Sequence, residues 1–261
     1  LEQAAEEDGQ APMVQLGDAS IASPFTSRSN SVFPVSYILQ QGRCTLVTTY
    51  QIFRILAVNC LVTAYSLSVL YIDGVKLGDT QATVAGMAVA IFFLFLSRTN
   101  PSEQLSEARP PSSLFTMRII FSIVGQCAAH MAALVYCVDM AHKIYLKEKG
   151  ERVVDIEGDF EPDLVNTAVY LIMCATQFTT FFVNYQGQPF MESLQENKAL
   201  FYGLLMACVC VVLLVLAPFS DLNYLLELSP LPFWFRLRLL GVLMADFVIC
   251  WGWEKLVMFL F

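Results

Sequence analysis

Six long apolar runs separated by polar segments dominate the pattern of hydrophobic and polar positions along the chain. The runs cover about residues 35–71, 80–96, 115–138, 164–183, 200–217 and 235–261. Because about 20 apolar residues in a helix cross the ~30 Å hydrocarbon core of a bilayer, the pattern predicts six membrane-spanning helices. The first run is longer than a bilayer requires, and its opening residues include Gln40, Gln41 and Arg43. We expect that part to project into water as a stalk.

The amino-acid composition also indicates a membrane protein rather than a soluble domain. Of the 261 residues, 56% are hydrophobic and 15% are charged, whereas a soluble domain carries about 25% charged residues. No basic patch is interleaved with aromatic residues, so the composition predicts no nucleic-acid partner. Lysines and arginines are divided almost equally between the two sides of the predicted membrane, so charge alone does not assign the orientation.

The polar segments around the runs indicate two parts of unequal size. Residues 1–34 contain an acidic stretch, a short apolar run over 13–16 and a serine-rich segment with two prolines. Such a piece is too short to fold alone, and we interpret it as the remnant of a cytosolic domain cut from a longer protein. Residues 35–261 form the predicted membrane domain, in which 139–163 and 218–234 are expected to be loops.

Motifs for chemistry are few. The sequence has no glycine-rich phosphate loop, no Gly-x-Ser-x-Gly turn and no His-Glu-x-x-His pair, so it predicts no catalytic residue and no nucleotide site within this chain. Most of the eight cysteines lie inside apolar runs, where a thiol usually packs as a small hydrophobic group. Neither their spacing nor that of the histidines and carboxylates predicts a metal site.

Polar residues inside the apolar runs are the natural functional candidates, because burying them in a bilayer is costly. Gln177, Thr180 and Asn184 are spaced i, i+3, i+7 and share one helix face, which either lines a polar pathway or forms interhelical hydrogen bonds. Asn166 begins the same run. Asp246, well inside the last run, is expected to face the bundle or a cavity, or to pair with Arg236, Arg238 or a polar group on a neighbouring helix.

Three further residues receive a structural interpretation. His130 is expected to be a packing residue whose polar atoms are satisfied locally. Glu254 and Lys255, near the end of the last run, are expected to reach the membrane interface with their charged groups.

Five segments have a distinctive residue order. They are residues 16–27 (LGDASIASPFTS), 41–49 (QGRCTLVTT), 64–74 (AYSLSVLYIDG), 160–170 (FEPDLVNTAVY) and 184–198 (NYQGQPFMESLQENK). In this order they resemble five parts of the P-type ATPases of type V, subclass A. These parts are the end of the phosphorylation domain, the stalk of the fifth membrane helix, the end of that helix, the start of the eighth helix, and the loop between the eighth and ninth helices.

The resemblance implies an all-α polytopic fold containing the fifth to tenth membrane helices of such a pump. Members of the family reside in the endoplasmic-reticulum membrane and extract mislocalised transmembrane helices; they have also been treated as cation pumps. ATP with Mg²⁺ phosphorylates an aspartate in segments that this chain lacks, so the fragment alone is expected to bind neither and to be inactive. The implied partners are client transmembrane helices and the remaining domains of the same polypeptide.

The resemblance also gives the candidate residues their roles. The second, fourth and fifth runs are implied to form the far wall of a groove for the client helix. Gln177, Thr180, Asn184, Asn166 and Asp246 are then candidates to line this groove. A rigid first helix transmits rotation of the phosphorylation domain into the membrane, which makes Gln41 and Arg43 the predicted coupling residues.

Two other functions fit the same pattern of runs. A cation-transporting ATPase of this architecture requires clustered carboxylates inside the membrane, and the sequence offers essentially Asp246 alone. A non-enzymatic channel or scaffold made only of six helices is the second alternative. An Asp-Lys-Thr-Gly-Thr motif upstream in the reading frame is expected for the helix-extracting pump and for the cation-transporting ATPase, but not for the channel or scaffold.

Overall fold

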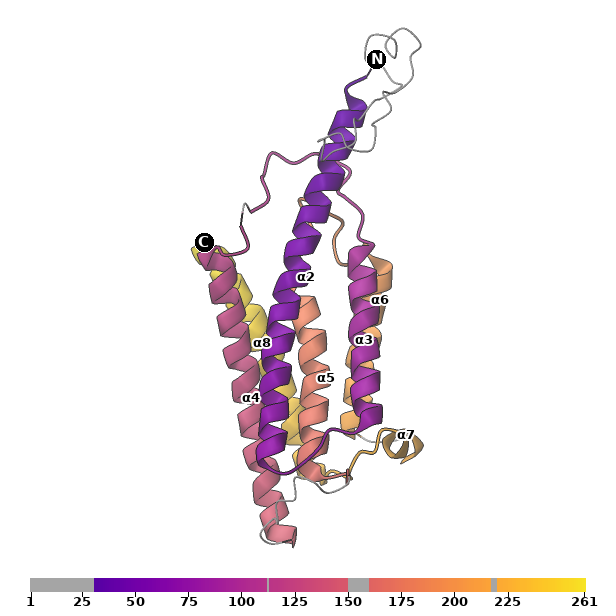
Figure 1. Cartoon of the computed structure of the whole chain (residues 1–261), viewed down its shortest axis with the longest axis vertical. Coiled ribbons are helices and arrows are strands. Elements are labelled where there is room, and N and C mark those ends of the chain that lie inside the picture. The colour runs from indigo at the N-terminus through magenta and orange to yellow at the C-terminus, as the bar shows by residue number, and fades with distance from the viewer. Residues whose placement is uncertain (1–30, 112, 150–159, 217–219) are drawn as a thin grey trace, which may run out of the picture.

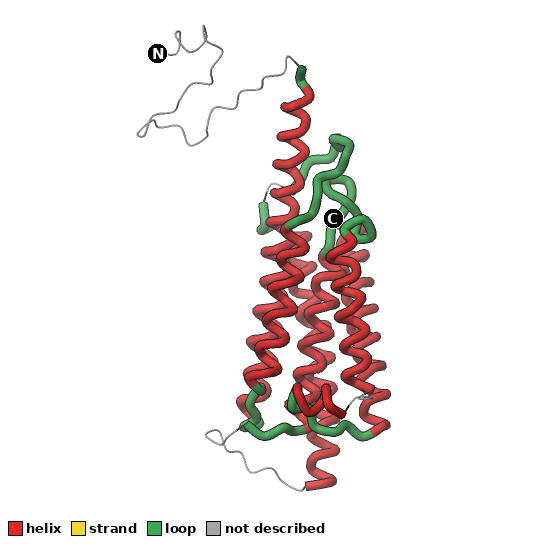
Figure 2. The backbone as a smooth tube through the Cα atoms, turned by 90° about the vertical axis from the view of Figure 1, so that its right-hand side faces the viewer, coloured by secondary structure: helices red, strands yellow, loops and turns green. Residues whose placement is uncertain are grey.

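The chain folds into a bundle of long helices that run side by side, with loops gathered at its two ends (Figures 1 and 2). This computed structural model describes residues 31–111, 113–149, 160–216 and 220–261. Within them the helices are α2 (Phe33–Ile72), α3 (Asp79–Ser97), α4 (Met117–Lys149), α5 (Leu164–Asn184), α6 (Lys198–Leu216), α7 (Ser220–Leu225) and α8 (Phe233–Leu260). The first residues of α2, the α3–α4 and α5–α6 loops and the C-terminus all lie at one end of the bundle, the stalk end (Figure 1).

Five helices, α2 to α6, are long and apolar enough to cross a membrane. Helix α8 has 28 residues and runs beside α4 (Figure 1), but it carries five Asp, Glu, Lys or Arg side chains. The prediction of an all-helical polytopic membrane fold is therefore confirmed, whereas the count of six spans stays a prediction. The proposed cytosolic remnant, including the short run over 13–16, lies almost entirely outside the described residues.

Helix α5 is the centre of the bundle. In its most apolar stretch 83% of the residues are buried, compared with 22–33% in the other four candidate spans. It packs against α2, α4, α6, α8 and, less extensively, α3. Side chains on nearly every face of α5 therefore meet other helices, and the polar ones need partners inside the protein.

Aromatic side chains fix α5 against two of its neighbours. The Phe181 ring lies edge-on to Phe92 and Phe93 of α3, with ring centroids 5.2 and 4.9 Å apart. Phe178 stacks on Phe247 of α8 at 5.9 Å. Such pairs add about 0.5–1.5 kcal/mol each to the burial of the rings.

A small residue permits the close approach of α4 and α8. A Cβ atom at Gly125 would lie only 1.9 Å from Nε1 of Trp253. The Trp253 indole N–H occupies that space and donates to the Phe121 carbonyl at 2.9 Å. Small residues have this role at many membrane helix crossings, because they let a large neighbour pack against the backbone.

The loop prediction for 139–163 is wrong in its first part, since α4 continues to Lys149. Asp139 pairs with Lys143 one turn later on α4, which favours helix. His142 Nε2 lies 2.8 Å from the Asp73 carboxylate, so this extension is also attached to the end of α2. The short helix α7 interrupts the second predicted loop.

Candidate functional site

An ion pair lies inside the bundle near the stalk end. Arg54 of α2 and Glu254 of α8 approach to 2.6 Å, and their side chains are only 4% and 10% exposed. Arg54 Nε also donates to the side-chain oxygen of Asn184 on α5. Removing both charges from water costs several kcal/mol, about as much as their attraction returns, so such a pair requires additional hydrogen bonds.

Helix α4 supplies those additional hydrogen bonds. Ser122 Oγ donates to Glu254 Oε2 at 2.5 Å, and Gln126 Nε2 lies 3.2 Å from the same oxygen. Asn184 Nδ2 donates to Gln126 Oε1 at 2.7 Å. Arg54, Ser122, Gln126, Asn184 and Glu254, which we call the interhelical network, therefore connect α2, α4, α5 and α8 through polar contacts. A connected buried polar network of this kind favours one arrangement of its helices.

A second polar cluster lies between α4 and α8. Nδ1 of His130 is 2.9 Å from both carboxylate oxygens of Asp246. The thiol sulfur of Cys250, one turn after Asp246 on α8, lies 3.7 Å from His130 Nε2. All three residues are buried. The expectation that Asp246 pairs with a polar group on a neighbouring helix is met by His130.

Asn166 lies at the opposite end of α5 from the interhelical network. Its Nδ2 donates to the Lys76 carbonyl at 2.7 Å, and its Oδ1 accepts from Gln81 Nε2 at 3.0 Å. Gln81 also donates to the Leu226 carbonyl at 3.0 Å. These bonds join α3, α5 and two loops, so Asn166 closes the end of the bundle away from the stalk.

The stalk helix is attached to the α3–α4 loop by two side chains. Arg43 donates to the carbonyl oxygens of Ser106 and Ala108, the latter at 3.1 Å. Gln40 donates to the Glu103 carbonyl at 2.9 Å. Gln41, the other predicted coupling residue, is half-buried, and its side chain makes no hydrogen bond within the part of the chain that the structure describes.

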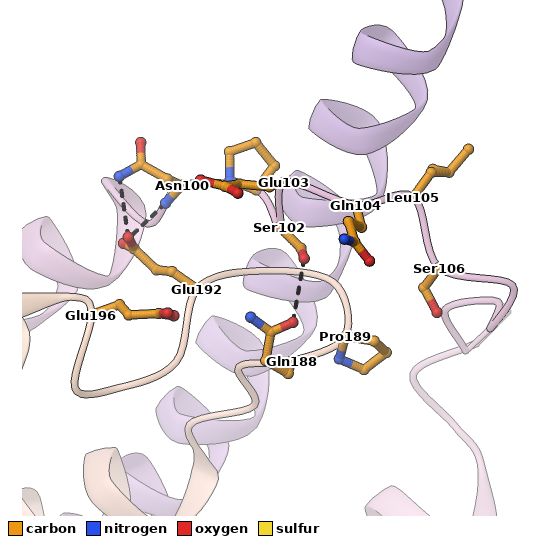
Figure 3. A pocket seen from close by; sticks show the side chains of 11 residues that line it. Asn100, Ser102, Glu103, Gln104, Leu105, Ser106, Gln188, Pro189, Glu192 and Glu196 are labelled. Atoms are coloured by element: carbon orange, nitrogen blue, oxygen red, sulfur yellow. Dashed lines mark hydrogen bonds between the residues drawn. The ribbon is translucent and has the colours of Figure 1, made fainter.

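The α3–α4 and α5–α6 loops enclose a recess of about 790 Å³ (Figure 3). Across it, Glu192 accepts from the backbone N–H and side-chain amide of Asn100 at 3.1 and 3.3 Å, and Ser102 Oγ lies 3.3 Å from Gln188 Oε1. The carboxylates of Glu103, Glu192 and Glu196 contribute to the lining. The recess is therefore polar, and α2 holds both of its loops. Gln40 and Arg43 bond to the α3–α4 loop, and Gln51 Nε2 donates to the Gln186 carbonyl of the α5–α6 loop at 2.7 Å.

Two titratable groups of the α5–α6 loop have shifted pKa values. The backbone N–H of Ser193 bonds to the Glu196 carboxylate at 2.6 Å and, with the Ser193 hydroxyl, lowers the pKa of Glu196. Burial raises the pKa of Tyr185 to about 12. The Tyr185 hydroxyl donates to the Glu192 carbonyl at 2.8 Å, so the neutral phenol fixes the start of the loop.

The structure separates the predicted groove residues. Asn184 belongs to the interhelical network, and Thr180, also fully buried, accepts from Asn184 through its carbonyl at 2.8 Å. Gln177 is half-buried on the same helix. Asp246 lies in the second cluster and Asn166 at the far end. Contact between these five residues and a client helix stays a prediction. In this structure Thr180 and Asn184 are buried against neighbouring helices.

Sequence reasoning missed two charged members of the network. Glu254 does not reach the membrane interface as expected, because α8 directs it inward to Arg54. Asp246 is therefore not the only buried carboxylate. An arginine inside an apolar run is a functional signal by itself, so Arg54 was detectable from the sequence. Its partner, 200 residues away in sequence, was not.

These features define a helical membrane region with buried polar networks and a stalk that leads out of it. The sequence profile described as "Cation transporting ATPase, C-terminus" matches residues 87–257. The chain belongs to this family, and the resemblance to the type V P-type ATPases is confirmed.

Curated relatives match almost the whole chain. The chain is 47% identical over 257 residues to a probable manganese-transporting ATPase of Arabidopsis thaliana. This match covers 98% of the chain and 22% of the relative. It is 44% identical over 252 residues to an endoplasmic reticulum transmembrane helix translocase of Saccharomyces cerevisiae, covering 97% and 20%. A translocase with the same description from Aspergillus fumigatus is 43% identical over 255 residues, covering 98% and 19%. The chain thus spans about a fifth of the length of these relatives.

Proposed function

We propose that this chain is the C-terminal membrane region of an ATP-driven pump that extracts mislocalised transmembrane helices from the endoplasmic-reticulum membrane. ATP and Mg²⁺ act in other segments of the parent protein. The similarity to two proteins described as transmembrane helix translocases supports this function. The structural observation that carries it is the unbroken helix α2, attached to loops at the stalk end and to three other helices inside the bundle.

Helix α2 has the length needed to transmit motion. Its 40 residues span about 60 Å at about 1.5 Å per residue, twice the ~30 Å of hydrocarbon that it has to cross. Arg43 holds its outer part to the α3–α4 loop, and Arg54 holds its inner part to α5 and α8. A tilt of the outer part therefore displaces the loops and the interhelical network together.

The candidate groove residues divide into two roles in this proposal. Asn184 is a positioning residue, because its contacts go to Arg54 and Gln126 rather than to an open surface. Gln177 is less enclosed. Of the three residues on this polar face of α5, Gln177, Thr180 and Asn184, it is the one best placed to meet a client helix. The exposed faces of α3 and α6, with Met87 and Met206 more than half exposed, provide the apolar wall that such a client requires.

Cation transport is less well supported by the interior of the bundle. Asp246 and Glu254 are the buried carboxylates among the described residues, and each already faces a basic side chain. They also lie in separate clusters, the interhelical network and the His130–Asp246 pair, so they do not form the grouped carboxylates that a cation-transporting ATPase requires. The match of almost the whole chain to ATPases also favours a pump over an isolated channel or scaffold.

The proposal is tested in the full-length pump reconstituted in liposomes with a client transmembrane peptide. We expect Asn184→Leu and Gln177→Leu to reduce client-stimulated ATP hydrolysis more than basal phosphorylation. Ser68→Leu, an exposed polar-to-leucine change on α2, is the matched control and should change neither. An equal loss of stimulated hydrolysis and basal phosphorylation in the Asn184 and Gln177 variants would assign these residues to folding instead.

Photocrosslinking tests the location of the client. A photoreactive residue at Met206 of α6 should capture the peptide in a nucleotide-dependent way, and one at Thr180 should not, because Thr180 is enclosed by other helices. Efficient capture from Thr180 and none from Met206 would contradict the proposed wall.

A further inference from the structure

Three possible metal ligands meet in the interior of the bundle, farther from the stalk than the interhelical network. His130 comes from α4, and Asp246 and Cys250 come from successive turns of α8. Their ligand atoms lie within 4.8 Å of one another, and all three residues are buried. We propose that these residues bind Zn²⁺ and that the ion connects α4 to α8. This site does not depend on the helix-extraction function proposed above.

The distances between the donor atoms suit tetrahedral coordination. Zinc bonds of about 2.0–2.3 Å at tetrahedral angles place neighbouring donors roughly 3.3–3.6 Å apart. In the structure His130 Nδ1 is 2.9 Å from Asp246 Oδ1, and Cys250 Sγ is 3.9 Å from each of these two atoms. These separations differ from the tetrahedral values by about 0.3–0.4 Å.

The charges of the ligands also fit a divalent ion. Zinc binds an aspartate and a cysteine in their anionic forms and a histidine in its neutral form. The two negative charges then balance the two positive charges of the ion, which leaves the occupied site neutral. Binding releases the thiol proton and any additional proton on the imidazole. Neutrality matters because an unbalanced charge at this depth would be strongly unfavourable.

The combination of donor atoms selects the kind of metal. A nitrogen, a sulfur and an oxygen donor form a set that suits zinc, whereas manganese and magnesium prefer oxygen ligands. The thiolate of Cys250 is therefore the group that separates a zinc site from a manganese site.

The competing explanation is a histidine–aspartate ion pair beside an uninvolved thiol. Both explanations predict that loss of His130 or Asp246 destabilises the α4–α8 contact. They differ at Cys250, because the ion pair does not need a sulfur atom. Replacement of Cys250 by serine preserves the volume and a polar atom but removes the soft ligand, which makes it the decisive variant.

The experiment measures zinc in the full-length protein, purified in detergent and dialysed against a chelator that removes loosely held metal. Plasma mass spectrometry should find about one zinc more per chain in the wild type than in Cys250→Ser or His130→Ala. Cys208→Ser, a half-buried cysteine on α6, is the matched control and should retain the wild-type zinc content. Equal zinc in the wild type and Cys250→Ser would overturn the proposal.

A second measurement protects the test against misfolded variants. Cobalt substituted into the wild-type protein should show a thiolate-to-cobalt charge-transfer band. The Cys250→Ser variant should lack this band and should still elute as a folded, monodisperse species. Exhaustive chelation should lower the thermal midpoint of the wild type and leave that of Cys250→Ser unchanged. Absence of the band in the wild type, or displacement of zinc by an equal concentration of Mn²⁺, would exclude the zinc site.

Discussion

Replacing Glu254 by glutamine leaves the Arg54 guanidinium without its counter-charge inside the bundle. The two groups are 2.6 Å apart and have side-chain exposures of 10% and 4%, so water cannot take the place of the lost carboxylate. Removal of one member of a buried ion pair costs about 3–5 kcal/mol. Asn184 still accepts a hydrogen bond from Arg54, so we expect a loss near the lower limit, about 3 kcal/mol.

A double-mutant cycle separates the ion pair from general damage to the packing. Arg54→Met combined with Glu254→Gln removes both charges, and we expect the double variant to regain about 2 kcal/mol relative to the sum of the single changes. Resistance of the full-length protein to unfolding in dodecyl sulfate provides the free energies. Lys255→Gln, at the exposed neighbouring position on α8, is the control and should have little effect.

The outcome that refutes this reasoning is additivity. If the two single changes and the double change agree within about 0.5 kcal/mol, Arg54 and Glu254 do not interact in the folded protein. The stalk helix would then have no charged connection to α8, and the transmission of motion through the interhelical network would lose its main support.

Three other changes test separate parts of the structure. Arg43→Ala should leave phosphoenzyme formation intact and slow its turnover, measured in the full-length pump, because the stalk loses two bonds to the α3–α4 loop; unchanged turnover would exclude this coupling role. Gly125→Ala should cost about 1–3 kcal/mol by collision with Trp253, whereas Gly86→Ala, with open space around it, should not destabilise the protein in thermal unfolding. Burial raises the pKa of Tyr185 to about 12, so its stabilising neutral form is fully present below about pH 10 and is lost as the pH rises towards 12. Thermal midpoints should therefore fall over this alkaline range in the wild type and less steeply in Tyr185→Phe, and parallel curves would argue against Tyr185 as the titrating group.

The sequence by itself determined the helices and the class of protein. Apolar runs long enough to cross a bilayer can form little except helices there, because hydrocarbon offers no partners for backbone polar groups. The ends of most helices agree with the runs to within about two residues. The clearest exception is α4, where charged residues after Val138 lowered the hydropathy without ending the helix. The order of residues in five segments was sufficient to indicate the family.

Only the tertiary structure decided which polar groups meet. Arg54 and Glu254, like His130 and Asp246, lie on helices far apart in the chain, and their pairing depends on the rotation of each helix about its axis. Hydropathy is almost insensitive to that rotation when a helix is apolar on all sides. The same reason explains why Asn184 looked like a groove residue in the sequence. The periodicity placed it correctly on a polar face of α5, but the position of α5 at the centre of the bundle turned that face towards other helices.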